Sequence, residues 1–219
     1  MKTFVFLLCL ICSGSSIFSQ NASPVYDSAF QELYKQIALH PPTLNRRGKP
    51  FQPVIKKWDQ DISIFIEGGN AESRNHIEQK LKSVISGITP ALGNKIKISF
   101  VTNKSGSNYL IKLDTIGQNS SWYLRWDAYY NIYNCILTIN TKTVFNLDEQ
   151  AGKVSSDFLK SLGDFNISQL EKPVASNMVV WRKDMTQTDL RILELQYSDE
   201  IKPGMKEKDI DRYFFSHGQ

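Results

Sequence analysis

The chain has 219 residues, of which 41% are hydrophobic and 22% are charged, and its formal net charge is +4. This composition is that of an ordinary globular protein, and it excludes a low-complexity or disordered chain. The charge is far below the strongly basic balance of a nucleic-acid-binding domain, so we expect no nucleic acid among the partners.

Residues 1–19 predict a signal peptide. Met1 and Lys2 give a positively charged start, residues 3–12 are a nearly unbroken apolar run, and residues 13–20 are small and polar. The run is shorter than the roughly 20 residues that span a bilayer, so we expect cleavage near Ser19 and no transmembrane span. A lipid anchor, the alternative, needs a small residue before the acylated cysteine, and neither cysteine of the run has one.

Cysteine usage indicates the source of the protein. Once the signal is removed only Cys135 remains, so the mature chain cannot form an internal disulfide. An exported protein of this size that folds without disulfides depends on its hydrophobic core, unlike the small cysteine-rich domains of secreted eukaryotic chains. We therefore expect a bacterial protein that is periplasmic or secreted.

Residues 20–57 are expected to form an N-terminal helix and a basic linker. Apolar residues at three- and four-residue spacing predict a helix over residues 25–40, which Pro41 and Pro42 end. The segment from Thr43 to Lys57 has five basic residues and no acidic residue. We interpret it as an extended, solvated strap, and the alternative is a docking site for an anionic surface or polymer.

The main domain is expected to begin at Trp58 and to have an α+β fold. Alternating or apolar runs predict strands at residues 61–66, 96–102 and 109–113. Between the first two strands, a single apolar stripe predicts a helix from Ala71 that Gly87 ends.

The second half of this domain begins with the most aromatic stretch of the chain. Six tryptophan and tyrosine side chains precede an apolar strand at residues 135–139. Asn146 or Asp148 is expected to cap a helix that stops at Gly163.

The end of the chain is expected to contain one more helix and a tail. Thr186 or Thr188 is the expected cap of that last helix. The domain then closes at residue 205, and residues 206–219 form a charged C-terminal tail.

The order of these elements resembles a known family. Strand, helix, two strands, an edge strand with Cys135 and a helix ending at Ser161–Gly163 are similar to the zincin layout of secreted metallopeptidases. Residues 189–193, Tyr197 and residues 201–205 resemble the end of an exported bacterial family of unknown function with that layout. Over residues 58–205 the resemblance implies a zincin-like mixed sheet with packed helices.

The resemblance also implies a degenerate metal site. In an active zincin this helix carries His-Glu-x-x-His, which sets two imidazoles one turn apart and a glutamate beside the metal-bound water. Counting back from Gly163, the histidine places fall on Ser156 and Lys160 and the glutamate place on Asp157. A lysine at a ligand position opposes a metal ion, so we expect no metal, no cofactor and no catalysis by this route.

The rest of the chain offers no obvious replacement site. The three histidines lie on separate segments: His40, His76 and His217. Cys135 is expected to be a buried strand cysteine rather than a nucleophile. A pair of acids, Asp127 with Asp157 or Glu149, stays open as the site of a glycoside hydrolase.

The aromatic stretch supplies the candidate groove, which we assign to Trp122, Trp126, Tyr129 and Asp157. These aromatic side chains either fill the core or bind a ligand beside the edge strand. We expect a non-catalytic, pseudo-metallopeptidase-like binding module that takes a peptide or glycan in a vestigial cleft. The alternatives are a hydrolase with a nonstandard carboxylate site, and a structural accessory of an envelope assembly that docks an envelope protein through the basic strap.

Overall fold

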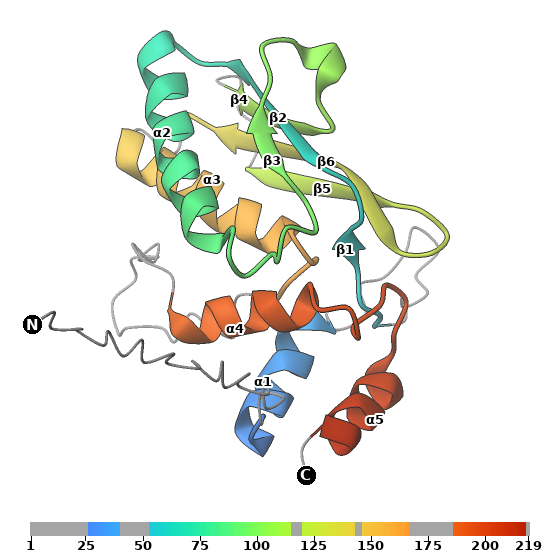
Figure 1. Ribbon diagram of the computed structural model, residues 1–219. Coiled ribbons are helices and arrows are strands. Elements are labelled where there is room, and N and C mark those ends of the chain that lie inside the picture. The colour runs from blue at the N-terminus through green and yellow to red at the C-terminus, as the bar shows by residue number, and fades with distance from the viewer. Residues whose placement is uncertain (1–25, 40–52, 115–119, 143–145, 167–185, 218–219) are drawn as a thin grey trace, which may run out of the picture.

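The fold is α+β, with helices packed on a mainly parallel sheet (Figure 1). The computed structural model describes residues 26–39, 53–114, 120–142, 146–166 and 186–217. Helices α2 and α3 cover one face of the sheet, and α1, α4 and α5 form a second layer below it (Figure 1).

The sheet has six strands, of which five are parallel. The six strands are β1 (Lys57–Trp58), β2 (Ile62–Gly68), β3 (Ile98–Phe100), β4 (Tyr109–Asp114), β5 (Ser121–Trp126) and β6 (Asn131–Asn140). Ile132 of β6 pairs with both Trp58 and Trp126, so β1 and β5 lie on opposite edges of β6. β4 lies on the same side of β6 as β1, and β2 and then β3 follow it. The antiparallel strand β5 lies at the opposite end of the sheet from β3.

This order corrects one expectation. Cys135 does not lie on an edge strand, because its strand β6 is paired on both sides, with Tyr109 of β4 and Leu124 of β5 opposite Cys135 itself. The edge strand next to β6 is β5, which lies inside the aromatic stretch and forms a hairpin with β6.

Helices α1 to α4 each begin after a capping side chain. The helices are α1 (Ser28–Ala38), α2 (Ala71–Ile88), α3 (Leu147–Ser161), α4 (Gln187–Gln196) and α5 (Glu207–His217), with a short 3₁₀ turn at Lys104–Gly106. The side chains of Asn70 and Asn146 accept backbone N–H bonds at the starts of α2 and α3, and Thr186 forms a reciprocal capping box with Asp189 before α4.

The helix ends differ from the predicted ones. α2 continues through Gly87 to Ile88, since Gly87 does not adopt the left-handed backbone that would end it. After α3 the left-handed residue is Asp164, with φ 55°, rather than Gly163. Gly163 is required for space, because a Cβ there would lie 2.4 Å from the ring of Phe165.

The core fills the space between the sheet and helices α2 and α3. Its central side chains come from alternate strand positions and one helix face: Ile62, Ile64, Tyr109, Ile111, Leu137, Ile139, Val154 and Phe158, none of which is exposed to solvent. The two helices are also joined by polar contacts, from Ser73 Oγ to Gln150 Oε1 at 2.8 Å and from His76 Nε2 to Asp148 Oδ1 at 2.8 Å. His76 therefore links α2 to α3.

The second layer joins the two ends of the described chain. Phe214 of α5 packs edge-on against Tyr26 and Tyr34 at ring distances of 5.6 and 6.0 Å. The Tyr34 hydroxyl donates to Gln196 Oε1 of α4 at 2.7 Å. Within residues 206–219, predicted as a charged tail, Glu207–His217 thus form a helix whose Ile210 and Phe214 are buried.

The last residues of the predicted basic strap also differ from expectation. Lys56 is buried and forms an ion pair with Asp164. The Lys57 ammonium donates to three carbonyl oxygens at and after the C-terminal end of α4, at 2.6 Å for Ile201, 3.3 Å for Ser198 and 3.4 Å for Gln196. These lysines point inward because the ends of helices and turns supply acceptors for them. Residues 43–52 of the strap, and His40, lie outside the described residues.

Candidate functional site

The three residues predicted as degenerate metal positions, Ser156, Asp157 and Lys160, lie on α3. Asp157 is 3% exposed, and its two oxygens meet the ammonium groups of Lys153 at 2.7 Å and Lys160 at 3.7 Å. Ser156 is partly exposed. Two cations beside one carboxylate leave a net positive charge, which opposes the entry of a metal ion.

The parts of the chain that the structure describes also contain no cluster of metal-binding side chains elsewhere. Within them, no group of three or more histidine, cysteine, aspartate or glutamate side chains could hold a metal ion.

Next to Asp157 lies a buried polar cluster. Tyr109 Oη is 3.1 Å from Ser161 Oγ, which donates to the Phe158 carbonyl at 2.6 Å, and the Trp58 indole donates to the Ser161 carbonyl at 3.0 Å. Cys135 is fully buried, as the sequence predicts. Burial, with a smaller effect of the Asp157 carboxylate, raises the pKa of the Cys135 thiol to about 12. The thiol is therefore neutral and unsuited to nucleophilic attack.

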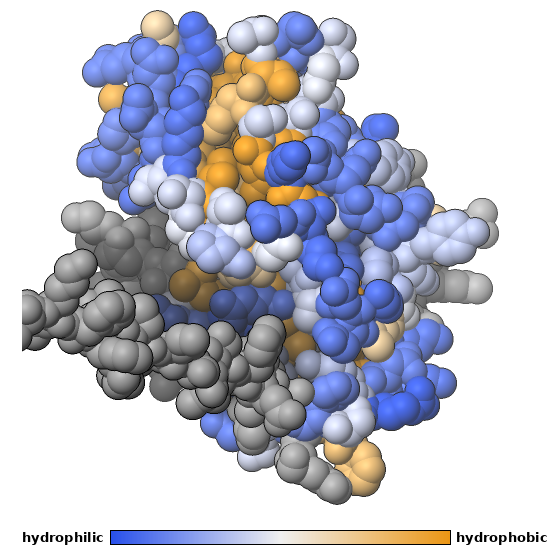
Figure 2. All heavy atoms as spheres, in the orientation of Figure 1, coloured by the Kyte–Doolittle hydropathy of each residue, from blue (hydrophilic) through white to orange (hydrophobic). Residues whose placement is uncertain are grey.

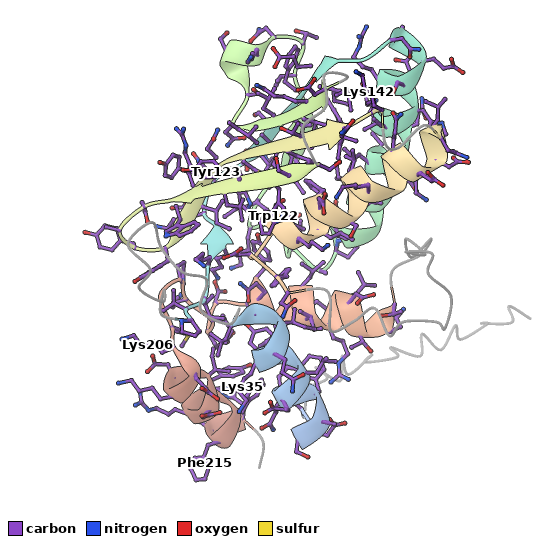
Figure 3. The ribbon with its side chains drawn as sticks, turned by 180° about the vertical axis from the view of Figure 1, so that it is seen from behind. Lys35, Trp122, Tyr123, Lys142, Lys206 and Phe215 are labelled. Carbon is purple, nitrogen blue, oxygen red and sulfur yellow. The ribbon has the colours of Figure 1, made fainter. Side chains whose placement is uncertain are left out.

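The aromatic side chains of β5 divide between the two faces of the sheet. Cys135 is close to Asp157 and Ser161, so α3 covers its face of β6. Trp122 pairs with Leu137, two residues along β6 from Cys135, and thus lies on the α3 face, while Tyr123 lies on the opposite face and is 57% exposed (Figure 3). Trp122 is partly buried against the core.

Trp126 lies at the other end of β5, where the strand register is irregular. The Lys56 ammonium is 4.5 Å from the centre of its ring and is also paired with Asp164. Trp126 thus packs between the hairpin and the segments around β1 and the end of α3, with a cation–π contact to a buried lysine.

Tyr129 and Asp127 belong to the turn of the β5–β6 hairpin. Tyr129 is 76% exposed and points away from the core. Asp127 accepts bonds from the Tyr129 and Asn131 amides at 2.8 and 3.0 Å and from the Asn131 side chain at 3.0 Å. These bonds, led by that of the Asn131 side chain, lower the pKa of Asp127. Both oxygens of Asp127 therefore hold the turn.

The candidate groove residues thus occupy three environments. Trp122 and Trp126 are half-buried on the helix-facing side of β5, Asp157 is buried on α3, and Tyr129 is exposed at the hairpin turn. Glu149, the remaining acid considered for a carboxylate site, is exposed in the first turn of α3.

The sequence did not predict a groove between α2 and β3, which has a mixed polar and apolar lining. It has a volume of about 540 Å³ and is lined by Glu78, Lys82, Ile85 and Ser86 of α2 and by residues 98–102. Figure 2 shows apolar side chains at the surface over this region. The apolar positions of β3 are visible in the sequence, but the position of β3 at the edge of the sheet depends on strand order.

No helix in the described ranges is both long enough and apolar enough to cross a membrane. Comparisons with protein-family models, with curated proteins and with solved structures each returned no match.

Proposed function

We propose that this chain is an exported bacterial binding module, without catalytic activity, that takes an extended peptide or a glycan beside β5 and α3. The proposal includes a zincin-like relationship with a degenerate metal site. It is supported by the antiparallel edge strand β5, which follows the four parallel strands β1 to β4 in the chain, and by α3, which directly follows β6. In the layout that the sequence resembles, the substrate lies beside such an edge strand.

The observation that carries the non-catalytic part is the pairing of Asp157 with Lys153 and Lys160. A general base needs to reach the proton that it removes, whereas Asp157 is 3% exposed and both of its oxygens face ammonium groups. The same pairing disfavours the alternative of a hydrolase built on Asp157.

The binding part is supported by β5. Among the described strands β5 pairs with β6 only, so its other edge can accept the main chain of an extended ligand. Partly exposed Trp122, on the face toward α3, offers a flat apolar surface to a peptide side chain or a sugar ring.

Adjacent residues on β5 provide the test. Trp122→Ala removes an aromatic ring from the α3 face, and the control Tyr123→Ala removes one from the opposite face. We expect arrays of defined peptides and oligosaccharides to show a ligand of the wild-type protein that Trp122→Ala weakens and Tyr123→Ala does not. Each variant is also melted. If Trp122→Ala lowers the melting temperature strongly and leaves ligand capture unchanged, Trp122 is a packing residue and the proposed groove is wrong.

A structural accessory role remains the second candidate. The observation that favours it is the surface of the β5–β6 hairpin rather than the predicted basic strap. Tyr123, Tyr129 and Tyr133 are large exposed side chains on β5, β6 and their turn, at 57%, 76% and 43% exposure. Exposed tyrosines are common anchors in protein interfaces. Co-purification of the tagged protein from its native envelope, with and without Tyr129→Ser, tests this role.

A further inference from the structure

The groove between α2 and β3 lies at the opposite end of the sheet from β5. Among the described strands β3 pairs with β2 only. The carbonyl of Lys97 and the amide of Val101 bond to β2. Because backbone groups alternate along a strand, those of Ile98 and Phe100 point to the open edge. β3 can therefore accept one further strand.

The side chains of such a strand would enter the groove. Ile98 and Phe100 pair with the fully buried Ile62 and Ile64, so they lie on the face that the helices cover. α2 extends over this edge, because Ile85 and Ser86 line the groove together with residues 98–102. The volume of about 540 Å³ is within the range of ligand-binding pockets, about 300 to 1,000 Å³.

The charges of the groove restrict the ligand. Its lining contains two charged side chains, Glu78 and Lys82, and these pair with each other at 2.7 Å. Lys82 also lies 5.7 Å from the centre of the Phe100 ring. The lining thus has no net charge, and a charged ligand side chain would lose water without gaining a free partner. An uncharged segment matches this lining.

We infer that the α2–β3 groove binds an extended, uncharged peptide segment with aliphatic side chains at alternate positions, which adds a strand to β3. The main chain of the peptide bonds to Ile98 and Phe100, and every second side chain contacts Ile85, Ile98 and Phe100. This site is separate from the groove proposed beside β5, and it does not depend on that proposal.

The test uses a capped, fluorescein-labelled hexapeptide of alternating valine and threonine as the probe, with binding measured by fluorescence polarisation. Ile98→Pro removes the outward N–H of β3 while leaving the groups that pair with β2, and Ser86→Trp fills the groove from α2. Ser83→Trp is the matched control, since Ser83 is exposed on α2 but does not line the groove.

We expect the wild-type protein and Ser83→Trp to bind the probe, and Ile98→Pro and Ser86→Trp to bind it about tenfold more weakly or not at all. A probe N-methylated on its backbone should not bind. The inference is overturned if the wild-type protein does not bind the probe, or if Ser86→Trp binds it as well as Ser83→Trp does. It is also overturned if sedimentation shows a dimer that Ile98→Pro and Ser86→Trp dissociate, because the occupant is then a second copy of the chain.

Discussion

Cys135 should be nearly unreactive in the folded protein. At about pH 8, a thiol with the ordinary pKa of 9.0 is about one tenth thiolate, whereas a thiol with a pKa of about 12 is about one part in 10⁴ thiolate. The raised pKa alone therefore slows the reaction by about a thousandfold. Cys135 is also completely buried, so the reagent must wait for the structure to open. For a stability of about 5 kcal/mol, global opening exposes roughly one molecule in 5,000.

The assay follows an aromatic disulfide reagent whose thiolate product absorbs visible light. The chain from residue 20 onward contains Cys135 as its single thiol, so the signal belongs to one residue. We expect the rate in concentrated guanidinium chloride to exceed the folded rate by about a thousandfold or more. Cys135→Ser gives the blank. Folded and denatured rates within about tenfold of each other would refute the burial of Cys135 on β6.

Three further predictions concern metal content, alkaline stability and glycine positions. The purified protein should contain no stoichiometric zinc by elemental analysis and should melt at the same temperature with and without EDTA, because Lys153 and Lys160 neutralise Asp157. One tightly held zinc per chain would contradict this prediction. The folded pKa of Cys135 exceeds its unfolded value, so stability should fall as pH rises from about 9 to 12, and Cys135→Ala should fall less steeply in urea titrations over that window. Gly68→Ala should cost about 1 to 3 kcal/mol, because φ is +79° and a Cβ would lie 2.5 Å from the Leu113 carbonyl oxygen, whereas Gly87→Ala in open space on α2 should stabilise by about 0.5 to 1 kcal/mol. Equal unfolding midpoints for these two variants would contradict the backbone assignment.

Local signals in the sequence predicted much of the fold. The start of α3 follows from Asn146, one of the two expected caps, and the apolar stripe that predicted α2 from Ala71 matches its buried face. The burial of Cys135 follows from the apolar run around it. These features depend on residues that are close in sequence.

The features that were missed depend on distant residues. Trp122, Leu124 and Trp126 alternate with Tyr123 and Arg125 as in a strand, but the place of β5 at the end of the sheet depends on its pairing with β6. Helix α5 was missed because only Ile210 and Phe214 are buried among many charged residues.

The candidate site was harder to predict than the fold. The ion pairs of Asp157 follow from helical spacing alone, since Lys153 and Lys160 are four and three residues away. In contrast, the inward direction of Lys56 depends on Asp164, which is 108 residues away. The groove at β3 depends on strand order, which local patterns do not specify.

The contact between α1 and α5 also constrains how the protein is made. Tyr26 and Tyr34 pack against Phe214, so the face of α1 toward α5 cannot be covered until the last helix has been synthesised. Until then the aromatic side chains of α1 remain open to chaperones and proteases. Loss of the final ten or so residues should therefore affect the lifetime of the whole second layer, although those residues are far from the sheet in the chain.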